Sequence, residues 1–397
     1  MRFLRHILWP LAIIYGIITS IRNFLYNHNY FRSYTFPVPV IAVGNLSVGG
    51  TGKTPMVEYL IRLFSDSHKI AVLSRGYKRK SEGFILANAN TTAEDLGDEP
   101  FQYFSKFKNI LVAVDAQRKN GIEQLLQLPQ KPEIILLDDA FQHRKVKANF
   151  YVLLTAYSDL FTDDFMLPVG NLREVKSGAQ RAQAVVVSKC PNELSEKEQT
   201  RIKQAIQKHT SAPVFFSTIA YDSYLWNGTQ KIALSDLAEE TILSVAGIAK
   251  PKPFFDYLHS KIKTIDFLTF ADHHDFTANE IAHILQQANG KKIITTEKDF
   301  MRLQGKIPSE QLFYLPIQTQ FLSNEKELIK LIQREIKFAK SKKQASITLK
   351  MNSLSDTELI EASASPRNPM VCTDSRSPRL AILLVAWRLS AVGSSVR

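Results

Sequence analysis

Cysteine is scarce in this sequence, with two residues, Cys190 and Cys372, in a chain of 397. Two cysteines cannot build a framework of several disulfides, nor a zinc site made of thiolates alone. Such sparse use of cysteine suits a protein that works in a reducing compartment.

The sequence also lacks an apolar run of the about 20 residues that a membrane-spanning helix usually needs. The run from Ile7 to Ile18 is shorter, and it follows the basic residues Arg2 and Arg5. A signal peptide has a similar profile, but no clear cleavage site of small residues follows here. We therefore predict that residues 1–30 form a helix lying in a membrane interface, with arginines at the headgroups and aromatic rings beside them. A buried core helix is the alternative.

Acidic residues are outnumbered, 38 against 50 basic ones, which gives a formal net charge of +12. A basic surface favours acidic partners such as nucleic acid, anionic lipid or a phosphorylated substrate. Because we find no zinc pattern, aromatic RNA-binding motif or recognition helix, we do not expect a nucleic-acid partner.

A phosphate-binding loop is the strongest motif in the chain. The apolar run Val40–Val43 leads into a glycine-rich turn, Gly52-Lys53-Thr54 closes it, and apolar residues at helical spacing follow. This strand–loop–helix context lets backbone N–H groups and a helix N-terminus hold the phosphates of ATP. We predict that Lys53 reaches the β- and γ-phosphates and that the Thr54 hydroxyl faces Mg²⁺. The whole predicted loop is Ser47, Val48, Gly49, Gly50, Thr51, Gly52, Lys53 and Thr54.

The match to the common pattern is incomplete, because Ser47 stands where its first glycine is usual. The loop therefore fits the Gly-Gly-x-Gly-Lys-Thr variant better. A glycine-rich turn that happens to precede Lys53 and Thr54 is the alternative interpretation.

Further apolar runs, separated by helical stretches, predict an α/β fold of the P-loop NTPase type, with a mostly parallel sheet covered by helices on both faces. The expected strands lie at 69–77, 110–114, 134–139, 150–154 and 184–188. In such sheets ligands bind beyond the carboxyl ends of the strands.

The pattern of predicted strands and helices changes near residue 221, which predicts more than one domain. We place a P-loop domain at 31–220, a smaller α/β domain at 221–315 and a returning helix at 316–340. Residues 341–397 scatter Ser, Pro and Arg without periodicity, so we predict a disordered tail.

Charged residues at predicted strand ends are candidates for chemistry. Asp138 and Asp139 end an apolar run, where a carboxylate would meet Mg²⁺, although a turn or helix cap is the alternative. Asp98 or Glu99 could accept a proton from an attacking hydroxyl, or simply cap a helix.

Several other polar groups have two interpretations each. The arginines Arg75, Arg118, Arg144 and Arg173 could converge on phosphates or be solvated surface residues. The segment 272–275, Asp-His-His-Asp, could be a metal cluster or an acid/base dyad, and a lone His pair is usually neither. The charged segment 296–299 is often just a solvated turn.

Taken together, these segments resemble the tetraacyldisaccharide 4′-kinases, the lipid A kinases of Gram-negative bacteria. They follow the family's order over roughly residues 1–335. Ala140 stands where the family usually has glycine, and Val175 where it usually has proline. The matching segments are Gly44–Pro55, Ser74–Tyr77, Gly97–Pro100, Asp138–His143, Leu172–Glu174, Asp272–His274 and Thr296–Asp299.

The resemblance implies phosphorylation, by ATP and Mg²⁺, of the 4′-hydroxyl of an acylated glucosamine disaccharide 1-phosphate. It implies Asp98 as the base, with His273 as its partner from the second domain. It also implies Asp138, Asp139 and Glu174 as metal and neighbouring residues, and Arg118 and Arg173 as phosphate contacts. We expect a glycolipid substrate, a monomer, and a site at the cytoplasmic face of the bacterial inner membrane.

A regulatory NTPase that recruits partners to membranes is the main rival. Such switches often carry a lysine just before the paired glycines, and Val48 stands there instead. A switch would also have no need for Asp98 and His273, so the sequence favours the kinase.

Overall fold

The fold is that of a computed structural model, which describes residues 7–272 and 274–352, with side chains up to residue 341. His273, Cys372 and the rest of the predicted tail after Asn352 lie outside the described residues.

A nine-stranded sheet forms the larger lobe, in the order β15-β8-β7-β6-β1-β5-β2-β4-β3. Its inner strands are parallel, and the edge strands β3 and β15 are antiparallel to their neighbours. Buried residues fill β1 completely, as expected of a strand covered on both faces. The predicted fold class is therefore confirmed. The strands are β1 (Val40–Asn45), β2 (Ile70–Ser74), β3 (Ile85–Leu86), β4 (Leu111–Val114), β5 (Ile134–Leu137), β6 (Phe150–Ala156), β7 (Ala184–Ser188), β8 (Val214–Tyr221) and β15 (Ile317–Phe321).

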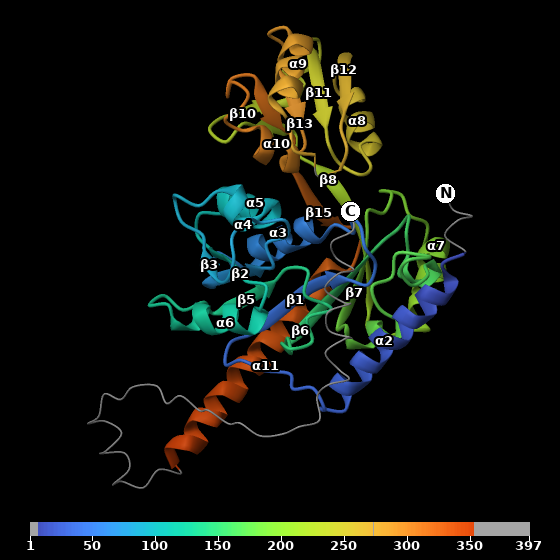
Figure 1. The fold of residues 1–397 in the computed structure, drawn as a ribbon, viewed down its shortest axis with the longest axis vertical. Coiled ribbons are helices and arrows are strands. Elements are labelled where there is room, and N and C mark those ends of the chain that lie inside the picture. The colour runs from blue at the N-terminus through green and yellow to red at the C-terminus, as the bar shows by residue number, and fades with distance from the viewer. Residues whose placement is uncertain (1–6, 273, 353–397) are drawn as a thin grey trace.

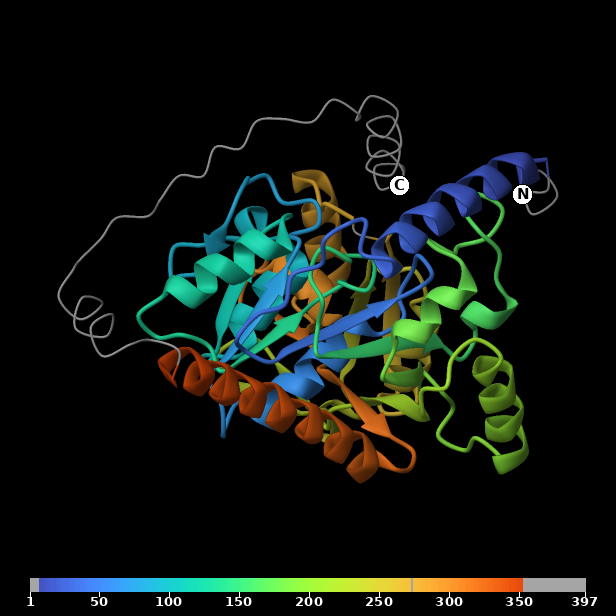
Figure 2. The same ribbon diagram turned by 90° about the horizontal axis from the view of Figure 1, so that it is seen from below.

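Helices cover both faces of this sheet (Figures 1 and 2). One apolar core joins α3 (Lys53–Phe64), α5 (Asp98–Lys106) and α11 (Glu325–Asn352) to one face. On the other face, α6 (Arg118–Gln127) and α7 (Glu196–Gln207) pack on separate clusters. The short helix α4 (Ala93–Leu96) leads into α5 through Gly97.

The smaller lobe comprises residues 222–316 and has a six-stranded sheet in the order β10-β9-β14-β13-β11-β12. The antiparallel pair β8 and β15 carries the chain out of the larger lobe and back (Figure 1). Helix α8 packs on one face, and α9 and α10 pack on the other. The elements are β9 (Tyr224–Trp226), β10 (Lys231–Ala233), β11 (Thr241–Ala246), α8 (Lys252–His259), β12 (Thr264–Thr269), α9 (Ala278–Ala288), β13 (Ile293–Thr295), α10 (Glu297–Leu303) and β14 (Leu312–Tyr314).

The C-terminal helix corrects two sequence boundaries. Residues 317–321 form β15 instead of the start of the returning helix, because they pair with β8. Helix α11 begins at Glu325 and continues past residue 340 to Asn352, so the tail does not begin at 341. The segment from Ser341 to Asn352 contains Lys, Gln, Ala, Leu and Met, which have good helix propensity, and no glycine or proline.

Helix α2 (Trp9–Asn27) has its polarity inverted relative to an ordinary surface helix. Thr19 and Asn23 face the protein and are buried, while Ile14, Ile17 and Ile21 are each 53% exposed. Figure 2 shows this helix on the outside of the larger lobe. Within the described part of the chain, we find no helix with both the length and the apolar character needed to cross a bilayer.

Candidate active site

The predicted phosphate loop connects β1 to α3 at the carboxyl end of the central strand. Gly52 precedes the helix with φ 78°, a left-handed conformation that favours glycine. Ser188 Oγ donates to the carbonyl of Thr51 at 2.7 Å, and Asn45 Nδ2 donates to Thr51 Oγ1 at 2.9 Å. These bonds fix the loop, and no side chain caps the N-terminus of α3. Such a helix N-terminus suits a phosphate group.

Asp138 follows β5, which pairs directly with β1, so the topology brings it beside the loop. The residue is 5% exposed, and Oδ1 is buried without a hydrogen-bond partner among the described residues. Its Oδ2 lies 3.4 Å from Tyr103 Oη, and the Tyr103 hydroxyl also interacts with the side chain of Thr54. Burial, with help from Asp139 and Glu99, raises the pKa of Asp138 to about 6.

This arrangement fits a magnesium ion. An unpartnered buried carboxylate oxygen near a threonine hydroxyl is the oxygen-donor environment that Mg²⁺ prefers, with the remaining ligands from water and phosphate. Asp138 and Thr54 would hold the ion.

Asp139 makes a different set of contacts from Asp138. Arg173 donates to its two oxygens at 2.9 and 3.2 Å, and Lys53 Nζ lies 3.7 Å from Oδ1. Burial opposes ionisation, but Lys53 and Arg173 hold the pKa of Asp139 well below its usual range. Asp139 therefore positions two cations at the phosphate loop.

Arg118 is not placed as a surface arginine or an open phosphate contact. Its guanidinium is buried and donates to the carbonyls of Asp115, at 2.7 Å, and Asp138, at 3.1 Å. Burial lowers the pKa of Arg118 to about 10. Because both terminal nitrogens bind backbone, Arg118 supports the strand ends that carry Asp115 and Asp138.

Glu174, predicted as part of the metal set, accepts hydrogen bonds from protein groups at both of its carboxylate oxygens. Arg181 donates to both carboxylate oxygens at 2.8 and 2.9 Å, Asn23 donates to Oε2 and Gln142 to Oε1, each at 2.9 Å. With both oxygens occupied, Glu174 anchors helix α2. Arg144 also anchors helix α2, since it donates to the Asn27 side chain at 2.7 Å.

Asp98 lies in the first turn of α5, and Arg302 of α10 donates to its carboxylate. Its neighbour Glu99 accepts from Lys298 of the same helix at 2.8 Å. The residue predicted as the partner of Asp98, His273, is outside the described residues, so that pairing stays a prediction. Arg302 was missed by the sequence reasoning, although it lies four residues after Lys298 on one helix face.

The two other charged segments of the smaller lobe make defined contacts within that lobe. His274 Nε2 lies 2.9 Å from Glu280 Oε1, and the ring stacks on Phe270. In residues 7–272 and 274–352 no cluster of three metal-binding side chains occurs. The segment 296–299 is not a solvated turn, because Glu297 and Asp299 are buried.

Lys189 is a second residue that sequence reasoning missed. It follows β7 with φ 58°, and its ammonium lies 3.5 Å from the position that a Cβ on Gly50 would take. Burial, followed by Lys250 and Lys298, lowers its pKa. A single lysine after a strand gives no signal that it reaches this loop.

A family model described as tetraacyldisaccharide-1-P 4′-kinase matches residues 4–337, most of the chain. The chain belongs to the tetraacyldisaccharide 4′-kinase family. The resemblance noted from the sequence motifs is therefore confirmed.

Relatives of this kinase family agree over nearly their whole length. The tetraacyldisaccharide 4′-kinase of Flavobacterium psychrophilum is 58% identical over 84% of this chain and 97% of its own. That of Bacteroides thetaiotaomicron is 42% identical over 81% and 90%. The crystal structure of LpxK from Aquifex aeolicus in complex with ATP has a TM-score of 0.69 and 32% identity, covering 84% of this chain and 99% of that one. Another family model, polyphosphate kinase C-terminal domain 2, matches only residues 319–365.

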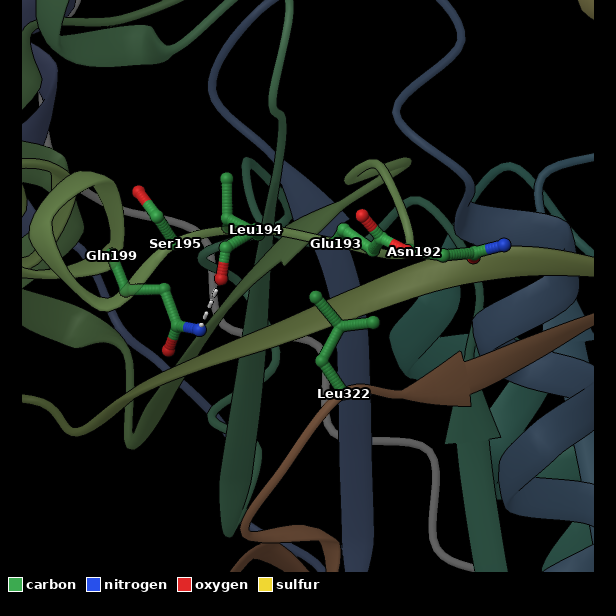
Figure 3. A pocket seen from close by; sticks show the side chains of 6 residues that line it. All are labelled: Asn192, Glu193, Leu194, Ser195, Gln199 and Leu322. Atoms are coloured by element: carbon green, nitrogen blue, oxygen red, sulfur yellow. Dashed lines mark hydrogen bonds between the residues drawn. The ribbon is translucent and has the colours of Figure 1, made fainter.

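Membership in this kinase family decides against the regulatory switch. It leaves the individual site residues as proposals. A hollow of about 450 Å³ lies elsewhere in the larger lobe, beside Leu322 (Figure 3). None of the predicted site residues lines it, so it is not part of the candidate active site. Its lining residues are Asn192, Glu193, Leu194, Ser195, Gln199 and Leu322.

Proposed function

We propose that this kinase transfers the γ-phosphate of ATP to the 4′-hydroxyl of a tetraacylated glucosamine disaccharide 1-phosphate, using Asp98 as the proton acceptor. Helix α5 is the observation that carries the proposal. It presents Asp98 in its first turn, and about one and a half turns later Tyr103 contacts Asp138 and interacts with the side chain of Thr54. One short helix thus ties the base to the predicted phosphate and metal site.

The proposed transfer forms one bond to the γ-phosphorus, breaks another and moves one proton. The acceptor oxygen forms a bond to the γ-phosphorus, the bond from that phosphorus to the bridging oxygen of ADP breaks, and the hydroxyl proton passes to Asp98. Lys53 and the loop from Ser47 to Thr54 hold the phosphates, which is most of what phosphoryl transfer asks of a protein. Asp138 and Thr54 would hold a magnesium ion, which would neutralise part of the phosphate charge.

The supporting residues follow from their contacts. Asp139 keeps Lys53 and Arg173 beside the loop. We propose that Arg173 approaches the transferred phosphate from there, because charge-assisted contacts to phosphate are among the stronger ones. Arg118 acts indirectly through the carbonyl of Asp138.

Helix α2 supports a peripheral membrane association at the cytoplasmic face of the inner membrane. Its polar side is tied to the protein, since the Tyr15 hydroxyl donates to the carbonyl of Arg173 at 3.0 Å and Asn23 donates to Glu174. Its outward residues are apolar and exposed. An interfacial helix buries such a face among lipid headgroups and acyl chains. A helix bound to the membrane in this way would hold the active-site loop near a glycolipid substrate. The monomer stays a prediction.

The transfer proposal is tested with labelled ATP and a panel of acylated disaccharide 1-phosphates against soluble sugars. Asp98→Ala should keep ATP binding while transfer collapses, and Lys53→Ala should damage both. Lys252→Ala, which removes an exposed ion pair with Asp256, is the control and should match wild type. Full turnover by Asp98→Ala would refute the role of the base, and phosphorylation of soluble sugars alone would refute the substrate.

The membrane proposal is tested by flotation with vesicles of phosphatidylethanolamine and phosphatidylglycerol. The triple substitution of Ile14, Ile17 and Ile21 by serine should lower partitioning by about tenfold or more, since each buried side chain of this size contributes roughly 1.5–3 kcal/mol. Phe267→Ser, at an exposed apolar residue of the smaller lobe, is the control. Unchanged flotation of the triple variant would remove α2 as the anchor.

A further inference from the structure

The first turn of α5 carries two adjacent carboxylates, and one helix of the smaller lobe supplies a cation to each. Arg302 donates to Asp98, and Lys298 donates to Glu99 at 2.8 Å. Lys298 and Arg302 are four residues apart on α10, so they share one helix face. The Arg302 side chain is 8% exposed, which places this contact mostly out of water.

Arg302 is itself held by the smaller lobe. Its Nη1 lies 4.0 Å from Asp299 Oδ1 and 3.4 Å from the carbonyl of His274. Asp299 is fully buried and accepts from the Gly247 N–H at 2.9 Å and from Thr296 Oγ1 at 2.7 Å. A guanidinium supported in this way has few alternative positions, so it can define where a neighbouring carboxylate points.

The far end of α5 is fixed by the same helix. Glu297, the first residue of α10, accepts from Lys106 at 2.5 Å and from Gln102 at 2.8 Å. Helix α10 therefore contacts α5 at its first and last turns. The position of the smaller lobe sets the position of α5 and of Asp98.

Charge makes these cations necessary at the first turn. In the larger lobe Glu99 follows Asp98 directly and itself interacts with Asp138, and in the smaller lobe Asp299, Asp272 and Asp275 lie around Lys298 and Arg302. Crowded carboxylates favour protonation, and a carboxyl that already holds a proton cannot accept one. Two cations close to the pair oppose that effect.

We propose that Arg302 is a positioning residue for phosphoryl transfer, which orients the Asp98 carboxylate and keeps it ionised, while Lys298 balances Glu99. The base is then competent only when α10 is docked on α5. This inference rests on the proposed function of Asp98 as proton acceptor.

The test compares Arg302→Gln, Arg302→Lys, Asp98→Asn and the double variant Asp98→Asn/Arg302→Gln in the full chain. Arg201→Gln is the matched control, because it makes the same change at an exposed ion pair on α7. Rates are measured with ATP and the acylated disaccharide 1-phosphate in detergent micelles, across the pH range in which each variant stays folded.

Arg302→Gln should lower kcat by about 10- to 100-fold, the size of effect that a misplaced catalytic group produces, with the KM for ATP little changed. The acid limb of its pH–rate profile should move to higher pH, because a carboxylate that loses a neighbouring cation is protonated more readily. Arg302→Lys should recover part of the lost kcat and part of the shift in the acid limb. When Asp98 is already replaced by asparagine, Arg302→Gln should lower kcat little further.

Two results would overturn the inference: an Arg302→Gln profile that matches Arg201→Gln, or losses that multiply in the double variant. Full turnover by Asp98→Asn would instead overturn the proposed function of Asp98, whatever Arg302 does. If Arg302→Gln does not fold, the kcat of Arg302→Lys decides, because lysine keeps the charge but loses the planar guanidinium, and a kcat equal to that of wild type counts against the inference.

Discussion

Glu297 offers a sharp test of the contact between the lobes. It is a buried carboxyl on α10 that shares Lys106 and Gln102 with Glu58 of α3. Burial, and then the charge of Glu58, raises the pKa of Glu297 to about 8. The test is Glu297→Gln, which keeps the size of the side chain and removes its titration.

The direction in which stability changes with pH follows from the number of protons that the folded and unfolded chains bind. An unfolded glutamate has a pKa of about 4.3, so between that value and about 8 the folded protein holds a proton that the unfolded chain lacks. The stability from this group is complete below about pH 4.3 and is lost as the pH rises through about 8. The free energy of unfolding should therefore fall as the pH rises from about 6 to about 7.5, by on the order of 2 kcal/mol.

Urea unfolding of the full chain, followed by circular dichroism at those two pH values, measures this slope. Glu297→Gln should have a flatter pH dependence than wild type by about 2 kcal/mol over that range. The comparison uses slopes, so any constant cost of the amide cancels. Glu310→Gln, an exposed glutamate of the same lobe, should keep the wild-type slope. Equal slopes for wild type and Glu297→Gln would refute the raised pKa of Glu297.

Three further predictions follow from individual contacts. Glu174→Gln should speed tryptic cleavage at Arg22, because Glu174 anchors α2. The Mg²⁺ dependence of the rate should stay unchanged. A higher Mg²⁺ requirement in this variant would favour a role for Glu174 in metal binding. Ile332→Ala should cost about 2–5 kcal/mol in urea unfolding, since Ile332 is fully buried where α11 packs on the larger sheet, and no loss would remove α11 from the core. Lys189→Ala should raise the KM for ATP by about tenfold, the loss of a charge-assisted contact, without changing the KM for lipid; an unchanged KM for ATP would exclude Lys189 from the nucleotide site.

The phosphate loop and the paired aspartates could be predicted because their signals are local. A strand, a glycine turn and Lys53-Thr54 are contiguous, and Asp138 follows a strand whose apolar run marks it as buried. Parallel strands align their carboxyl ends, so the sheet alone brings the loop and Asp138 together.

The roles of Glu174 and of Arg302 could not be predicted in the same way. Glu174 meets Asn23 across 151 residues of sequence, and Arg302 meets Asp98 across 204. No periodicity connects such distant positions. The sequence also did not show which side of α2 faces the protein. A short apolar run is compatible with a helix that buries its apolar side and with one that exposes it.

The amino-acid sequence by itself determined the parallel α/β sheet, the phosphate loop and the family to which the chain belongs. Tertiary structure decided which carboxylates are paired with arginines, as Asp139 and Glu174 are, and it decided that α10 packs against α5. The reason is physical: a charged side chain acts according to the partners that surround it, and packing of the lobes selects those partners.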